Sequence, residues 1–309
     1  MTFASRFLAN PDLFPARRSG EIWGTGRVVL DLPGGPYRFA GLNAEQTAAV
    51  QARFGAYCRE SEENPGVEGL VLRAAEVDFL RFSTAGWEYG LDFDHGPAAV
   101  RLAGIRLMGR LEWRPGLAAA LWTPDGGSDA FAGIFENLLR VLVAYRLLEA
   151  GGAVLHGAAL AGPGGGHLFL GRSGAGKSTL SRLAAEQGAE VLSDDLNALV
   201  SDEGEVRLVK LPFTGDWGDA ASPRAPLPLA ALHRLEKSGE DALTPLPRAA
   251  ALALAVACAP FVNADPCRRD ALLAVLDRLL PPDLPTWTLA FSLRGSFWPI
   301  LGRSCRPSR

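Results

Sequence analysis

Residues Gly171-Arg172-Ser173-Gly174-Ala175-Gly176-Lys177-Ser178 fit the phosphate-binding pattern G-x-x-x-x-G-K-[ST] at every fixed position. Glycines are needed there because backbone N–H groups must approach phosphate oxygens closely, with dihedral angles that other residues rarely adopt. Lys177 would bring a positive charge to the β- and γ-phosphates, and the Ser178 hydroxyl would hold Mg²⁺. The stretch therefore predicts a nucleoside triphosphate site made of the loop and the residue after it: Gly171, Arg172, Ser173, Gly174, Ala175, Gly176, Lys177, Ser178 and Thr179.

The segments on both sides of this loop are of the kinds that a phosphate loop requires. The apolar run at residues 167–170 is typical of a buried strand. After the loop, Leu180, Leu183 and Ala184 recur at helical spacing, and Gly188 is placed to end the helix. The loop would then lie at the N-terminus of a helix, whose dipole favours anions.

The segment before the loop predicts a β-hairpin. Residues 153–160 are strand-like, and the glycine-rich turn at residues 162–166 leads from them into the strand at 167–170. In many phosphate-loop proteins this strand is reached instead from a helix or from the chain terminus. The hairpin therefore indicates a subclass of phosphate-loop proteins in which the strand before the loop is the second strand of a hairpin.

Two aspartates follow the next predicted strand. Residues 190–192 read as a strand, and Ser193-Asp194-Asp195 come directly after it. Carboxylates at a strand end beside a phosphate loop are suited to a second metal contact and a catalytic base. Because neighbouring side chains on a strand point to opposite faces, both can act only if the strand has already turned into a loop. The alternative is that one aspartate merely caps a turn.

Beyond the aspartates, residues 196–200 and 206–210 predict a second hairpin around Asp202-Glu203-Gly204. A long irregular loop follows, up to Pro228, which is either a functional lid or a disordered segment. Helices are expected near residues 247–257 and from Asp265 to the Pro281-Pro282 pair, and a last strand near 286–293. Arg172, Lys210 and Arg248 are candidates for a phosphate clamp, and the sequence does not choose among them.

The N-terminal part of the chain predicts a separate β-rich lobe over residues 1–124, with a role in recognising a substrate or partner. Strand-like segments at 27–30, 69–72, 87–91 and 99–102 are separated by Gly/Pro turns, and one helix is expected at 44–56. Apolar residues at helical spacing then predict a long helix from Ser128 to Gly151. We expect this helix to dock on the sheet that carries the phosphate loop, within a P-loop domain at 128–309. The predicted class is α/β.

Composition narrows the classes of function. The 309 residues carry a net charge of −3, so there is no basic footprint for nucleic acid or an anionic membrane. The cysteines are scattered, without C-x-x-C pairs, and suit a reduced cytoplasm. The N-terminus lacks the apolar core of a signal peptide, and the longest apolar run, 249–262, contains Pro260 and is shorter than a membrane span. We expect a cytoplasmic protein that binds neither nucleic acid nor membrane. The sequence does not decide whether the protein forms a homo-oligomer.

Other phosphate-loop classes fit the sequence less well. An ABC-type ATPase would carry a segment like L-S-G-G-Q, and a GTPase would carry an N-K-x-D base-reading motif, neither of which is present in the sequence. Kinases of the adenylate or shikimate type begin close to their phosphate loop, whereas here a whole lobe precedes it.

Taken together, His156-Gly157 before the hairpin, the loop at 171–178 and Ser193-Asp194-Asp195 resemble the catalytic domain of the HPr kinase/phosphorylase family. That family is related in fold to ATP-dependent phosphoenolpyruvate carboxykinase. The resemblance covers about residues 150–300 and is strongest between His156 and Asp195. Thr179 stands where the family usually has glutamate, and its glycine/arginine-rich C-terminal signature is not found, so the chain looks most like the divergent members, some of which modify peptides.

The resemblance implies roles for individual residues. Asp194 would be the base that takes the proton of a serine hydroxyl, while Ser178 and Asp195 would serve the metal. His156 would lie close by in an electrostatic or proton-transfer role. Independently of the resemblance, Lys177 and Mg²⁺ would neutralise charge on the transferred phosphoryl group. Without the resemblance, His156 reads more readily as a packed strand residue.

The sequence thus predicts an ATP- and Mg²⁺-dependent kinase that phosphorylates a hydroxyl, with serine in a peptide or small protein as the first choice. One alternative is a kinase for a small metabolite. Another is a nucleotide-regulated binding protein, in which the triphosphate orders the Pro-rich loop without any transfer.

Overall fold

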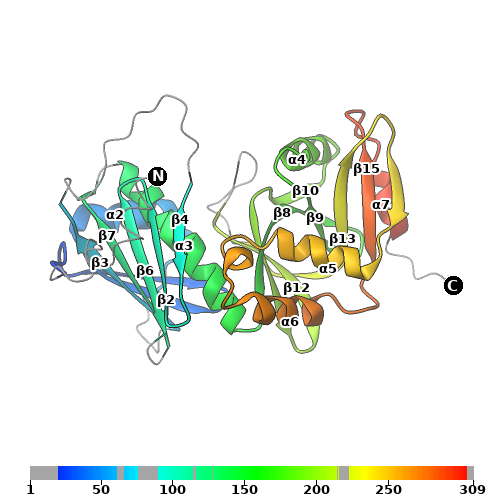
Figure 1. Cartoon of the computed structure of the whole chain (residues 1–309). Helices are drawn as coiled ribbons and strands as arrows, with labels where there is room; N and C mark the ends of the chain where they lie inside the picture. The colour runs from blue at the N-terminus through cyan, green and yellow to red at the C-terminus, as the bar shows by residue number, and fades with distance from the viewer. Residues whose placement is uncertain are drawn as a thin grey trace. The chain divides into compact units, whose positions relative to one another are not determined.

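The computed structural model describes residues 20–60, 66–75, 90–113, 116–127, 129–213, 215 and 223–304. Within them the chain is mixed α/β, with two mixed sheets and six α-helices. It divides into two compact units, Met1–Arg146 and Leu147–Arg309, each with its own sheet (Figure 1). Among these residues no helix is long and apolar enough to cross a membrane. Three parts of the predicted structure lie outside the described residues: the first three residues of the strand expected at 87–91, the helix start at Ser128, and much of the loop after Phe213.

The first unit is built on a seven-stranded sheet in the order β1-β2-β3-β7-β6-β5-β4. The strands β2, β3 and β7 run parallel to one another, and the remaining neighbours are antiparallel. Its elements are β1 Gly26–Leu32, β2 Gly35–Leu42, α2 Ala44–Phe54, a 3₁₀ turn Gly55–Tyr57, β3 Val67–Arg73, β4 Asp92–His95, β5 Ala99–Gly104, β6 Leu107–Trp113, β7 Leu117–Thr123 and α3 Asp129–Glu149. The strands predicted at 27–30, 69–72 and 99–102 and the helix near 44–56 are confirmed.

Helix α2 begins where the sequence supplies a complete capping box. The Asn43 side chain accepts a hydrogen bond from the backbone N–H of Gln46 at 2.8 Å, and the Gln46 side chain accepts from the Asn43 N–H at 3.1 Å. The buried Gln46 amide also donates to the Asp125 carbonyl at 2.8 Å. The cap therefore ties α2 to the segment that follows β7.

Helix α3 was expected to belong with the phosphate-loop sheet, but its aromatic contacts are made with the first unit. The Phe135 ring lies 4.6 Å from the ring of Phe39 on β2 and 6.0 Å from that of Phe54 on α2. Near the C-terminal end, the Arg146 side chain donates to the Gly34 carbonyl at 2.6 Å. The two units accordingly meet at residues 146 and 147, after most of the helix, and not in front of it.

The second unit is built on an eight-stranded sheet. Its main order is β10-β8-β11-β12-β13-β15-β14, and β9 pairs with both β8 and β13. Its elements are β8 Ala153–Gly162, β9 Gly165–Leu170, α4 Lys177–Glu186, β10 Glu190–Ser193, β11 Leu196–Asp202, β12 Glu205–Lys210, β13 Leu227–Lys237, β14 Ala242–Pro245, α5 Arg248–Ala257, a 3₁₀ turn Val262–Ala264, α6 Arg269–Leu279, β15 Thr286–Phe291 and α7 Trp298–Ser304.

Both predicted hairpins of this unit are present. Strands β8 and β9 pair antiparallel around the Pro163-Gly164 turn, where Gly164 has φ 81°, a value that suits glycine. Strands β11 and β12 pair around Glu203-Gly204. The helix predicted from Asp265 begins only at Arg269, because the buried Asp265 carboxylate caps a turn by accepting from the Cys267 N–H at 2.8 Å.

Helices cover the second sheet through two different sets of contacts. Residues of α4 and α7 share one apolar cluster with β8, β9, β13 and β15, whose buried members include Leu160, Phe169, Leu180 and Phe291. Helices α5 and α6 pack against each other, with α6 on β8 and β11 (Figure 1). The helix that carries the phosphate loop is thereby held on the sheet by its apolar side.

A buried histidine pair lies between β9 and β13. His167 Nε2 is 3.0 Å from the Pro163 carbonyl, which can only accept, so this nitrogen carries the proton. His167 Nδ1, 3.0 Å from His233 Nε2, then accepts from it. His233 Nδ1 is therefore unprotonated, and it is buried with no hydrogen-bond partner in the described part of the chain. Burial lowers the pKa of His167, and burial and the neighbouring His167 lower that of His233 well below its ordinary value.

The pair predicts that stability falls in mild acid. The unfolded chain takes up protons at both histidines below about pH 6.5, whereas the folded chain does so only at lower pH. The full contribution of the two histidines to the free energy of unfolding is therefore present above that pH. The free energy of unfolding decreases as the pH falls towards the lowered pKa values, by up to about 1.4 kcal/mol per pH unit for each histidine. Denaturant unfolding between pH 5 and 7.5 measures this slope, and His233→Phe, which removes one of the two groups, should roughly halve it. Equal stability at pH 5.5 and 7.5 would contradict the interpretation.

Candidate functional site

The phosphate loop leaves the end of β9 and enters α4, as the sequence predicts. Gly176 is the N-cap of α4 with φ 99°, and a Cβ atom there would lie 2.7 Å from Cζ of Phe291. Both the dihedral angle and the space therefore require glycine at this position. Residues of the loop and of the first turn of α4 line one pocket, and the free backbone N–H groups of a helix N-terminus are suited to binding phosphate.

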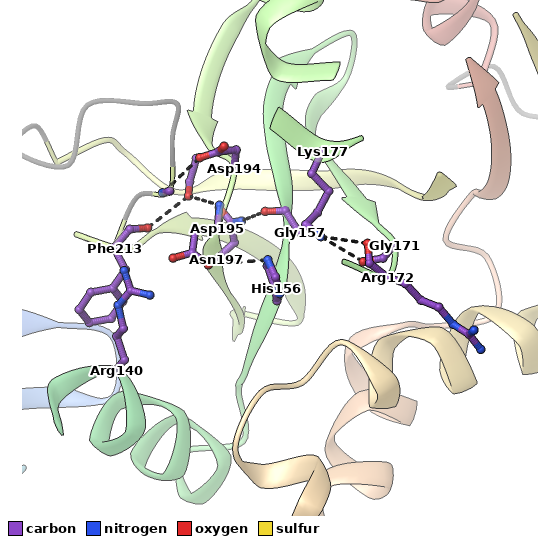
Figure 2. A network of polar contacts seen from close by, with 12 residues as sticks. Arg140, His156, Gly157, Gly171, Arg172, Lys177, Asp194, Asp195, Asn197 and Phe213 are labelled. Carbon is purple, nitrogen blue, oxygen red and sulfur yellow. Dashed lines mark hydrogen bonds and ion pairs between the residues drawn. The ribbon is translucent and has the colours of Figure 1, made fainter. Parts of the chain in front are cut away.

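The Lys177 side chain folds back onto the first residues of the phosphate loop. The residue is only 8% exposed, and Nζ donates to the carbonyls of Gly171 at 3.2 Å and Arg172 at 3.4 Å (Figure 2). Burial lowers the pKa of the Lys177 ammonium, while Cys258, Asp195 and Asp194 oppose that shift. The lysine is thus held close to the start of the loop, beside two carboxylates.

The two aspartates lie in the bend between β10 and β11. Strand β10 ends at Ser193 and β11 begins at Leu196, so the chain has left the strand where both carboxylates occur. Asp194 Oδ1 accepts from the Gly215 N–H at 3.2 Å. The Ser193 hydroxyl accepts from the Asp195 N–H at 3.1 Å and donates to the Phe213 carbonyl at 3.3 Å (Figure 2). The bend therefore lets both side chains face the same pocket.

His156 approaches the aspartates from β8. Its Nε2 is 3.8 Å from Asp195 Oδ1, and its side chain is 43% exposed. The next residue, Gly157, donates its N–H to the Asp195 carbonyl at 2.9 Å and accepts from the Asn197 side chain at 2.8 Å. These backbone bonds fix the histidine and the aspartate bend relative to each other.

Most of the predicted site residues line one pocket of about 440 Å³, which we call the phosphate pocket. They are His156, Ser173, Gly174, Gly176, Lys177, Ser178, Thr179, Asp194 and Asp195. Gly171 and Arg172 line a neighbouring cavity instead, and Ala175 packs on the apolar cluster beneath α4.

Two further residues of the phosphate pocket, Lys237 and Gly215, are not among those that the sequence analysis selected. Lys237 ends β13, which runs parallel to β9, with Arg234 paired to Leu170 at the base of the loop. The lysine therefore lies beside the loop, and its position in the sequence has this meaning only once β13 is known to neighbour β9. A glycine at 215 leaves room for the Asp194 carboxylate, because a Cβ atom there would lie 3.0 Å from Oδ1.

The other cations considered as phosphate clamps have different surroundings. Arg248 donates to the Leu280 carbonyl at 3.1 Å and pairs with Asp277 of α6 at 2.7 Å, so it joins α5 to α6. Lys210 is buried at the end of β12 and does not line the phosphate pocket. Arg172 is exposed at the loop.

The oxygen donors of the phosphate pocket fit Mg²⁺. The Ser178 hydroxyl and the carboxylates of Asp194 and Asp195 line the same space, and hard oxygen ligands are those that Mg²⁺ prefers. Among the described residues there is no cluster of three or more His, Cys, Asp or Glu side chains that could hold a metal ion. Mg²⁺ in nucleotide sites usually takes several of its ligands from substrate phosphates and water.

No protein-family model matches the chain, and no curated protein is significantly similar to it.

The geometry predicts that Lys237→Met weakens nucleotide binding. The substitution removes a cation beside the loop at an exposed position, so the Kd for Mg²⁺-ATP should rise by about fivefold. Isothermal titration measures the change. Glu236→Gln is the matched control, because Glu236 pairs with Arg234 at 2.8 Å and does not line the pocket. Equal affinity of Lys237→Met and wild type would remove Lys237 from the site.

Proposed function

We propose that the protein is an ATP- and Mg²⁺-dependent kinase that transfers the γ-phosphoryl group to a hydroxyl, with serine in a peptide or small protein as acceptor. The observation that supports this most directly is the meeting of the phosphate loop, the Asp194-Asp195 bend and His156 around one pocket. A binding protein needs the loop and a metal contact, whereas a second carboxylate beside them could also act as the base that a transfer reaction requires.

The proposal includes the fold and the family. Support for this part of the proposal comes from the antiparallel hairpin β8–β9, the loop that follows it and the bend before β11, together with the resemblance of these segments to the HPr kinase/phosphorylase family. We propose a P-loop domain of that type for the second unit, with the β-rich first unit as the part that recognises the acceptor. We also propose that the protein acts in the cytoplasm.

In the proposed reaction Asp194 is the base. It receives the proton of the acceptor hydroxyl while the oxygen forms a bond to the γ-phosphorus and the bond from that phosphorus to the β–γ bridging oxygen breaks. The products are phosphoserine and ADP. The Gly215 N–H bond to Oδ1 orients the carboxylate. Removal of the proton matters because a serine hydroxyl is a weak nucleophile.

The other residues bind and neutralise charge. The Lys177 ammonium, held at the carbonyls of Gly171 and Arg172, would also contact the β- and γ-phosphates from that end of the loop, where it stabilises the charge on the transferred group. Ser178 and Asp195 would hold the metal ion, which when bound neutralises negative charge on the phosphate oxygens. The His156 ring lies 3.8 Å from Asp195, and a protonated His156 would stabilise the negative charge of that carboxylate.

Asp194→Asn should separate transfer from binding. The amide keeps the shape of the side chain but cannot take a proton, so the rate of transfer should fall by about 10²- to 10⁴-fold while ATP affinity changes little. We would incubate wild type and variant with γ-labelled ATP, Mg²⁺ and extract of the source cells. A peptide or protein labelled only by the wild type supports the proposal. Label in a small metabolite would favour the metabolite kinase, and equal transfer by both proteins would remove Asp194 as the base.

Lys177→Ala tests the loop itself. Loss of a charge-assisted contact to phosphate should weaken ATP binding by about tenfold to a hundredfold. Isothermal titration measures the affinity, and the melting temperature without nucleotide shows that the variant is folded. Arg182→Ala is the control, because Arg182 lies on the same helix but is exposed and pairs with Glu186 at 2.7 Å. Normal ATP affinity of Lys177→Ala would refute the phosphate-loop assignment.

A further inference from the structure

A second cavity, of about 360 Å³, lies beside the first residues of the phosphate loop. We call it the α5 pocket, because Ala253, Leu254 and Ala257 of α5 form one side of it. Gly171, Arg172 and Ser173 of the loop form another. His156 and Ser173 line both this cavity and the phosphate pocket, so the two cavities are neighbours at these residues.

The walls of the α5 pocket are largely apolar. Beside the α5 residues it is lined by Pro260 and by the buried Cys258. Burial raises the pKa of the Cys258 thiol, which is therefore neutral at pH 7, although the Gly171 N–H and Lys177 oppose the shift. None of the described residues that line the cavity is acidic, and Arg172 is exposed at its edge. The pocket suits an uncharged apolar group and disfavours a cation.

The direction of the triphosphate follows from Lys177. In a phosphate loop the lysine reaches the β- and γ-phosphates, and here Nζ lies against the carbonyls of Gly171 and Arg172. These are the two loop residues that border the α5 pocket but not the phosphate pocket. Thr179 and Lys237 line the phosphate pocket only. The γ-phosphate therefore points towards the α5 pocket, and the nucleoside lies at the other end.

We propose that the α5 pocket binds an apolar side chain next to the acceptor hydroxyl, so that the substrate is a peptide with an aliphatic residue beside its serine. This inference rests on the proposed function. An acceptor must approach the γ-phosphate from the side opposite the leaving ADP. A side chain in the α5 pocket would hold the adjacent hydroxyl near His156 and the aspartate bend, which is where the base lies.

The probe is an oriented library of short peptides with one fixed serine and randomised neighbours. It is first incubated with the protein, Mg²⁺ and γ-labelled ATP, and the phosphorylated peptides are sequenced. In parallel, the library is passed over immobilised protein loaded with Mg²⁺ and the non-hydrolysable β,γ-imido analogue of ATP, and the retained peptides are sequenced. The second measurement reports binding without any need for transfer.

Ala257→Trp fills the pocket from an exposed position of α5, because helical side chains point towards the N-terminus and so cover Ala253. Ala249→Trp is the matched control: Ala249 is exposed on the same helix and does not line the pocket, and its side chain points away from it. ATP affinity is measured for both variants.

We expect enrichment of Leu, Ile, Val or Met at one position beside the serine in both selections. Ala257→Trp should remove the enrichment and lower kcat/KM for the best peptide at least tenfold, with ATP affinity unchanged, whereas Ala249→Trp should behave as wild type. Phosphorylation without apolar enrichment, or enrichment that persists in Ala257→Trp, would overturn the inference while the proposed function stands. A tenfold loss of ATP affinity in Ala257→Trp would also overturn it, because the nucleoside would then occupy the pocket.

Failure of the proposed function gives a different result. If apolar-flanked peptides bind in a manner that depends on Ala257 but none is phosphorylated, the pocket stands and the kinase does not. If no peptide is retained or phosphorylated, the α5 pocket is not an acceptor site.

Discussion

The pairing of β8 with three other strands is the constraint on which the site depends. The first half of β8 pairs with β11, with His156 opposite Leu196. Its second half pairs with β9, with Gly157 opposite Leu170, and with β10, with Ala159 opposite Ser193. Since β9 leads into the phosphate loop and β10 into the aspartate bend, one strand brings both to the level of His156. Any shift of the β8 register would separate groups that must act on the same phosphate.

The same constraint explains why local structure is irregular where the charges meet. The ladder between β10 and β8 shifts register between Val191 and Ser193, and the chain bends at Asp194 and Asp195 before β11 resumes the pairing. The backbone groups that leave the ladder find other partners: Gly157 bonds to Asp195, and Asp195 to the Ser193 hydroxyl. Buried backbone groups need such partners, and these hydrogen bonds stabilise the bend.

Beneath this polar arrangement, apolar packing fixes the loop from one side. Phe291 of β15 closes the space that a side chain at 176 would need, and Leu180 of α4 is completely buried in the cluster below. This packing restricts the loop on the side of the sheet. Such preorganisation is what lets a site favour the charge distribution of a transition state.

Local sequence patterns determined the elements: the glycines and Lys177 of the loop, the turn glycines of both hairpins, and the apolar spacing of α3 and α4 all act within a few residues of one another. They also indicated that Asp194 and Asp195 follow a strand. Only the tertiary structure decided what is far apart in sequence, because strand order depends on the packing of the whole sheet. It placed Lys237 beside the loop through the parallel pairing of β13 with β9, set α3 against Phe39 of the first unit, and put α5 next to Gly171. The apolar residues of α3 and α5 indicate that one face of each helix is buried. The sequence alone does not indicate which other elements cover that face.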